Sequence, residues 1–177
     1  MADRIDIRIS GAGGQGVILS GIILAEASAI YDETNAVQTQ AYGPEARGGA
    51  SKSEVIISQK RVNYPKVIDL DVLVALNQES YDKYIGDLEN GGTLIVDDSI
   101  KVSKEKKVKV YRLSLIAKAK EELGTKKVAN ILALGALAAV TDLISLTALE
   151  QVIPNRVPAG TEEINLKALK LGGKIVN

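Results

Sequence analysis

The sequence contains no cysteine, histidine, tryptophan or phenylalanine, and a single methionine. Cysteine thiolates hold iron–sulfur clusters, and cysteine and histidine hold most zinc ions, so the chain alone predicts neither kind of centre. A cysteine nucleophile and a Ser-His-Asp triad are excluded for the same reason. Catalysis by this polypeptide alone would therefore depend on Asp, Glu, Lys, Tyr, Arg or a bound cofactor.

Excess charge and long apolar runs are also missing. Lys and Arg together number 22, as do Asp and Glu, so the formal net charge is zero. This balance argues against nucleic acid or an anionic membrane as the main partner. The longest strongly apolar run, residues 128–140, is shorter than the roughly 20 residues that cross a bilayer, and no export-signal pattern opens the sequence. We therefore expect a cytoplasmic protein that binds neither nucleic acid nor membrane.

The length and the pattern of apolar residues predict one α/β domain over residues 1–177. Alternating isoleucines from Ile5 to Ile9 predict a strand, the apolar face of 17–30 a helix, and 35–40 a second strand, which together make half of a parallel β-α-β unit. Further strands are expected at 54–58 and 61–64, joined as a hairpin, and at 72–76, 93–96 and 108–113.

Helices are expected at 78–88, 114–123 and 128–140. Another helix should begin at a capping box at Thr147, and a last one should run from Thr161 to a stop at Gly172-Gly173. The run 128–140 is apolar on every side and should be buried deeply. Together these elements predict a three-layer α/β/α sandwich with a Rossmann-like, mostly parallel sheet and an antiparallel hairpin.

A glycine-rich loop lies between the first strand and the first helix. Gly11, Gly13 and Gly16 have the G-x-G-x-x-G spacing, and with Gly14 and Gln15 they form the first group of candidate site residues. Glycines at this spacing allow a tight turn and a close approach to an anion at the positive N-terminus of a helix. They can also serve only the packing of helix on sheet, and this alternative stays open.

Two common kinds of nucleotide site use such a loop, and this chain lacks the other residues that each of them needs. A nucleotide-binding P-loop has Lys and then Ser or Thr after its last glycine, whereas Val17 and Ile18 follow here. A nicotinamide site has an acid at the end of the second strand, where this chain has Gln40 and Ala41. The loop therefore predicts an anion contact without the rest of a dinucleotide site.

A second shaped loop, residues 41–50, reads AYGPEARGGA. It follows the second strand, so topology places it at the same carboxyl edge of the sheet as the glycine loop. Arg47 between flexible neighbours can bind a carboxylate or phosphate with its guanidinium fork, and Glu45 can orient it. Tyr42, Glu45, Arg47, Gly48 and Gly49 complete the candidate site residues. The alternative is an exposed turn with solvated charges.

Two stretches together resemble the gamma subunit of the 2-oxoacid:ferredoxin oxidoreductases: GAGGQGVILSG at 11–21 and QTQAYGPEARGGASKSEVIIS at 38–58. The similarity continues through VNYPK at 62–66, LVALNQESYDKY at 73–84 and the run 130–139. The form QTQ-YGPEARGG with YPK after it looks like the 2-oxoglutarate branch of that family. The resemblance implies the domain III fold of pyruvate:ferredoxin oxidoreductase.

The resemblance also implies an activity and a set of partners. Such complexes decarboxylate a 2-oxoacid on thiamine diphosphate with Mg, pass electrons through Fe-S clusters to ferredoxin, and deliver the acyl group to coenzyme A. Thiamine diphosphate would lie on the alpha and beta subunits, and the clusters on a cysteine-bearing chain, often a delta subunit. This chain would be inactive alone, with no bound cofactor, catalytic residue or metal ligand, and would help coenzyme A to approach.

Three alternatives remain open at this point. The chain could be the gamma subunit of an oxidoreductase for pyruvate or another 2-oxoacid. It could be a stand-alone NAD(P)- or flavin-dependent enzyme that uses the glycine loop. It could also be a purely structural assembly module.

Overall fold

The structure is a computed structural model that describes residues 4–41, 50–103 and 106–176. Its elements along the chain are β1 (Arg4–Ala12), α1 (Val17–Ile30), β2 (Asn35–Ala41), β3 (Ala50–Ser58), β4 (Leu70–Ala75), α2 (Gln78–Tyr84), η1 (Ile85–Asp87), β5 (Leu88–Asp97), β6 (Lys109–Leu113), α3 (Leu115–Leu123), η2 (Lys126–Val128), α4 (Ala129–Thr141), α5 (Leu146–Arg156) and α6 (Glu162–Lys174).

Six strands of the described chain form one mixed sheet in the order β2-β3-β1-β4-β5-β6. β1, β4, β5 and β6 pair in parallel, whereas β3 runs antiparallel to both of its neighbours, β1 and β2. β1 and β2 therefore point the same way but do not touch, because β3 lies between them. The mostly parallel sheet is confirmed, and the predicted β-α-β unit of β1, α1 and β2 is split by β3.

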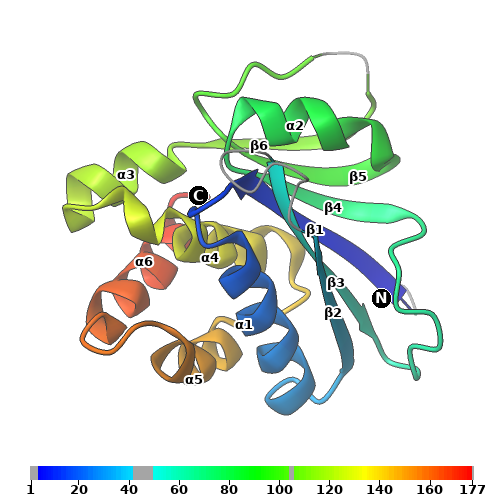
Figure 1. Ribbon diagram of the computed structural model, residues 1–177, viewed down its shortest axis with the longest axis horizontal. Helices are drawn as coiled ribbons and strands as arrows, with labels where there is room; N and C mark the ends of the chain where they lie inside the picture. Colours follow the sequence, from blue (N-terminus) through cyan, green and yellow to red (C-terminus); the bar gives the residue numbers. More distant parts are fainter. Residues whose placement is uncertain (1–3, 42–49, 104–105, 177) are drawn as a thin grey trace.

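Helices cover both faces of the sheet, so the three-layer prediction is confirmed, but the layers are unequal (Figure 1). One face buries side chains such as Ile7, Ile9 and Val74 against α1, α3, α4, α5 and α6. The other face packs Leu73 and its neighbours against Tyr81 and Tyr84 of the short helix α2. The period-two alternation of the strands explains this division, because successive side chains point to opposite faces.

The sequence pattern predicted the wrong partner for the antiparallel strand. β3 pairs with β2 and β1, and residues 61–64 form no strand. The carbonyl groups of Tyr64 and Lys66 accept hydrogen bonds from the Arg4 guanidinium instead of from a neighbouring strand. Pro65 has no backbone N–H to offer a sheet ladder.

Three helix or turn signals in the sequence also differ from what the structure shows. The cap before α5 is Ser145, whose hydroxyl accepts from the Ala148 N–H, and not the predicted box at Thr147. α6 continues through Gly172 and Gly173 to Lys174, because these glycines lie against neighbouring helices rather than ending this one. Residues 90–92, whose Asn-Gly-Gly sequence is typical of a turn, lie within β5, at an irregularity in its pairing with β4.

The apolar run near the end of the sequence forms α4 as expected, and its residues from Ala129 to Ala138 are buried. α3 ends at Gly124 in the left-handed conformation, also as expected. Among the described residues, no helix has the length and apolarity to cross a bilayer.

Candidate functional site

The glycine loop closes on itself at the carboxyl end of β1. The Gln15 N–H donates to the Ala12 carbonyl at 3.2 Å, which makes a tight turn. The Gln15 side chain folds back, and its Oε1 accepts the Ala12 N–H at 2.6 Å. Because this oxygen is used within the loop, Gln15 supports the shape of the turn.

Two of the predicted site glycines are needed for packing. A Cβ on Gly11 would lie 2.6 Å from the Gln15 Oε1, and a Cβ on Gly16 would lie 2.4 Å from the Asn130 Nδ2. Gly16 also has a φ of 71°, in the left-handed region, where it precedes α1. Gly11 and Gly16 therefore serve the packing of the loop, which is the alternative that the sequence left open.

Asn130 joins this loop to the buried helix α4. Its Nδ2 donates to the Gly16 carbonyl and to the Ser20 Oγ, both at 3.2 Å, and the Ser20 hydroxyl donates to the same carbonyl at 3.1 Å. Asn130 is buried. Sequence reasoning missed this contact, although a lone amide in an otherwise apolar run is a usable signal, because a buried amide needs partners.

Gly13 and Gly14 form the exposed tip of the loop. A Cβ on either residue would meet no atom within 4 Å, which places them against open space. Behind them, the N-terminus of α1 has no side-chain cap at Gly16. The free N–H groups of a helix start favour an anion. The five candidate residues thus divide into an exposed pair and a supporting set of Gly11, Gln15 and Gly16.

The second group of candidate residues, Tyr42, Glu45, Arg47, Gly48 and Gly49, lies outside the described residues. The strands on either side are described, and Ala50 of β3 pairs with Ala12 of β1. At the same edge, Ala41 of β2 pairs with Lys52 of β3. The strand ends therefore meet at the edge where the glycine loop begins, as the topology predicts, and the roles of the five residues stay a prediction.

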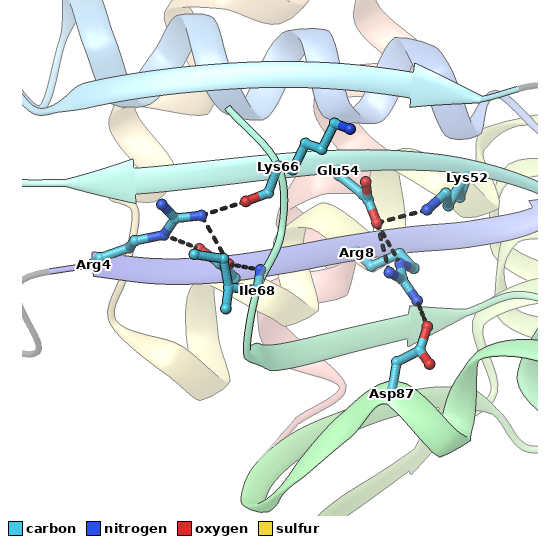
Figure 2. Close-up of polar contacts among 8 residues, drawn as sticks. Arg4, Arg8, Lys52, Glu54, Lys66, Ile68 and Asp87 are labelled. Atoms are coloured by element: carbon cyan, nitrogen blue, oxygen red, sulfur yellow. Dashed lines mark hydrogen bonds and ion pairs between the residues drawn. The ribbon is translucent and has the colours of Figure 1, made fainter. Parts of the chain in front are cut away.

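Charged side chains buried on the α2 face of the sheet were not predicted. Arg8 of β1 is 5% exposed. Its Nε donates to the Glu54 Oε1 at 2.8 Å and its Nη1 pairs with Asp87 (Figure 2). Its guanidinium lies 4.9 Å from the Tyr84 ring centre. Lys52 donates to the same Glu54 oxygen at 2.8 Å. This network ties β1, β3, α2 and η1 together.

The residues fit neither a metal nor a cluster of the kinds discussed above. No three acidic side chains gather to hold a metal ion in the part of the chain that the structure describes. The sequence supplies no cysteine or histidine as a donor. Iron–sulfur ligation needs those thiolates or imidazoles, so this chain does not have the donor set for a cluster.

A dinucleotide site is also disfavoured by the topology. In a dinucleotide-binding fold, the strand after the first helix lies beside the first strand and carries the acid that binds the ribose. Here β3 occupies the place beside β1 and runs antiparallel to it. The end of β2, at Gln40 and Ala41, is one strand further away and offers no acid.

The fold and the loop define a Rossmann-like α/β protein with a glycine loop at the carboxyl edge of its sheet, in which the described residues lack the strand order and the acid typical of a dinucleotide site. The chain belongs to the pyruvate ferredoxin/flavodoxin oxidoreductase family, which matches residues 6–175.

Individual relatives agree with this membership. The chain is 49% identical to the 2-oxoglutarate synthase subunit KorC of Methanocaldococcus jannaschii, covering 97% of this chain and 94% of the relative. It is 47% identical to the gamma subunit of a keto/oxoacid ferredoxin oxidoreductase from Geobacter sulfurreducens, whose crystal structure matches with a TM-score of 0.90 over 99% of this chain and 97% of that one. The fold also recurs, at 24% identity and a TM-score of 0.89, over 99% of this chain and 31% of the 2-oxoglutarate:ferredoxin oxidoreductase chain of Magnetococcus marinus.

Proposed function

We propose that the chain is the gamma subunit of a 2-oxoglutarate:ferredoxin oxidoreductase. The observation that carries the proposal is the near full-length identity to a 2-oxoglutarate synthase subunit, matched by a gamma-subunit structure of equal length. The complex would convert 2-oxoglutarate, coenzyme A and oxidised ferredoxin to succinyl-CoA, CO2 and reduced ferredoxin. It would work in the cytoplasm, and all 177 residues of this chain would form one domain of it.

The chain would contribute to this complex without carrying its redox chemistry. Its lack of cysteine and histidine supports the assignment of the Fe-S clusters to partner subunits. Thiamine diphosphate with Mg would likewise be held by the alpha and beta subunits, since this sequence has no G-D-G motif. The isolated chain should therefore be colourless and inactive.

The exposed tip of the glycine loop would serve an anion in the assembled enzyme. Gly13 and Gly14 are exposed beside an uncapped helix N-terminus, and the segment with Arg47 is attached to the sheet at the same edge. The anion would be a phosphate of coenzyme A or a carboxylate of a neighbouring subunit. Tyr42, Glu45, Gly48 and Gly49 would shape the other side of this contact.

The assignment is tested by purifying the complex through an affinity tag on this chain. We expect partner subunits to copurify and the complex to reduce ferredoxin faster with 2-oxoglutarate than with pyruvate or a branched 2-oxoacid, in each case with coenzyme A. Faster reduction with pyruvate would move the chain to another branch of the family. A tagged chain that copurifies with NAD(P) or flavin and with no partner would overturn the assignment.

The anion contact is tested in that complex with Gly13→Asp and its neutral control Gly13→Asn. Both side chains point into open space, so only the charge differs between them. If coenzyme A phosphates lie there, Gly13→Asp should raise the KM for coenzyme A several-fold over Gly13→Asn. If both variants show the wild-type KM, the loop does not contact coenzyme A.

A further inference from the structure

The motif YPK at 64–66, which helped to place the chain in its family, has no role in the site described above. The structure places it in the connection between β3 and β4, where residues 59–69 form no helix or strand. An irregular connection of this length usually moves freely unless side chains fix its backbone. Here an ion pair between a partly exposed arginine and a buried aspartate fixes the backbone of the connection.

The ion pair consists of Arg4 and Asp6, two residues apart on β1. The Arg4 Nε donates to the Asp6 Oδ1 at 2.7 Å, and its Nη2 donates to the Oδ2 at 3.1 Å. The same guanidinium donates to the carbonyl of Lys66 at 2.6 Å (Figure 2). It also donates to the carbonyl of Tyr64 at 3.1 Å. Asp6, which is buried, also accepts the Ile68 N–H at 2.8 Å. Three backbone groups of one short segment are thus bound to a single pair.

The segment that is fixed in this way presents apolar side chains to solvent. Tyr64 is 51% exposed and Ile68 is 62% exposed, while Val67 between them packs inward against the core under α2. Pro65 further restricts the backbone. Exposed apolar residues are ordinary when they are single and mobile, but two on one rigid segment are typical of a contact site. A backbone that is already fixed before binding loses less conformational entropy when it binds. Tyrosine is common among the residues that contribute most of the binding energy at interfaces.

Resting on the proposed function, we propose that residues 64–68 form a docking surface for a different subunit of the oxidoreductase complex. Arg61 and Lys66 are exposed beside the apolar pair, and Asp69 is the acidic residue of the stretch 61–69. The partner surface should therefore offer an apolar pocket with carboxylates at its rim. A second copy of this chain offers less opposite charge than a different subunit can, because the stretch 61–69 has two exposed cations, Arg61 and Lys66, and one exposed carboxylate, Asp69.

The test compares two pairs of substitutions in the assembled complex. Tyr64→Ser with Ile68→Ser removes the apolar surface. Val110→Ser with Leu146→Ser removes two apolar side chains that are 43% and 36% exposed and lie singly on separate elements, β6 and α5. We expect the first pair to weaken binding to the partner subunits by about tenfold or more, and the second to leave binding unchanged, with similar thermal unfolding of both isolated chains.

A third variant tests the fixing of the segment. Arg4→Met keeps length but loses the bonds to Tyr64 and Lys66, so it should weaken assembly even where circular dichroism shows a folded chain. If the wild-type chain binds no partner subunit, the proposed function fails. If the wild type binds and the Tyr64/Ile68 variant binds equally well, the surface proposal alone fails. Self-association of the wild-type chain that is lost in this variant would assign the surface to a second copy and would also overturn it.

Discussion

At the scale of single residues, the glycine loop divides into positions that build the turn and positions that face solvent. The sequence motif treats all its glycines alike. The contacts separate them, because Gly16 lies against Asn130 and Gly13 lies against nothing. This difference predicts opposite responses to the same small substitution.

Gly16→Ala should lower the free energy of unfolding by about 2–5 kcal/mol, from the positive φ and the contact of the new Cβ with the Asn130 amide. Gly13→Ala should change it by less than about 0.5 kcal/mol, because its Cβ enters open space. Urea unfolding of the two isolated chains measures both values. Equal stability of the two variants would mean that Asn130 does not fix the loop.

A pH effect is expected from Asp71, near the Arg4 and Asp6 pair. Burial raises the pKa of Asp71, and the charges of Asp6, Asp69 and Glu89 raise it further, while a hydrogen bond from the Asp6 N–H opposes the shift. A carboxyl with a raised folded pKa holds its proton better in the folded state, so stability falls as pH rises from about 4 through the folded pKa.

Asp71→Asn removes this charge and keeps an oxygen that can accept the Asp6 N–H. The variant should unfold at higher urea concentration than the wild type at pH 7, and the difference should shrink toward pH 3, where both side chains are neutral. Asp69→Asn, an exposed change at the same edge, serves as the control and should have a smaller effect. A difference that is independent of pH would show that the charge of Asp71 does not matter.

At the scale of elements, the contact of α4 with α6 depends on missing side chains. A Cβ on Gly135 would lie 2.1 Å from the Leu169 carbonyl oxygen, and one on Gly172 would lie 1.9 Å from that of Leu132. The two helices therefore approach each other backbone to backbone. This explains why a glycine pair that reads as a helix stop in the sequence lies inside α6.

The packing reverses the usual effect of alanine in a helix. Gly→Ala in a helix interior ordinarily stabilises by up to about 1 kcal/mol, but Gly172→Ala should destabilise by about 1–3 kcal/mol because the helices must separate. Gly173→Ala is the matched control and should be neutral or stabilising, since the nearest neighbour of its Cβ is the movable end of Leu146 at 3.2 Å. Thermal unfolding of both variants checks the sign. A stabilised Gly172→Ala chain would contradict this packing.

Most elements could be predicted from local patterns, and the errors share one physical cause. The strands and helices with a clear apolar period were found, including β1, α1 and α4. Local patterns do not report which strands pair, so the insertion of β3 between β1 and β2 was missed. The burial of Arg8 could not be deduced from the isoleucine alternation, because its compensation by Glu54 and Asp87 comes from residues far along the chain.

The candidate site was predicted only in part for a related reason. Gly11, Gln15 and Gly16 could be selected from their spacing, but their supporting role depends on Asn130, more than 100 residues away. The shared sheet edge of the two loops could be deduced, because β1 and β2 run in the same direction even though they are not neighbours.

At the scale of the whole molecule, the chain is a folded α/β body whose sequence has no cysteine or histidine to hold an iron–sulfur cluster. Its likeness to gamma subunits extends over nearly its full length. Its exposed features, the glycine tip and residues 64–68, are the surfaces that we propose to contact other molecules. The account therefore predicts a protein whose activity depends on assembly.

That dependence is measured most directly by the rate of coenzyme A-dependent ferredoxin reduction with 2-oxoglutarate, in a complex reconstituted from separate subunits. The account predicts no activity for this chain alone, background activity when it is omitted from the other subunits, and recovery when it is added back. A full rate in its absence, or turnover by the chain alone, would contradict the account.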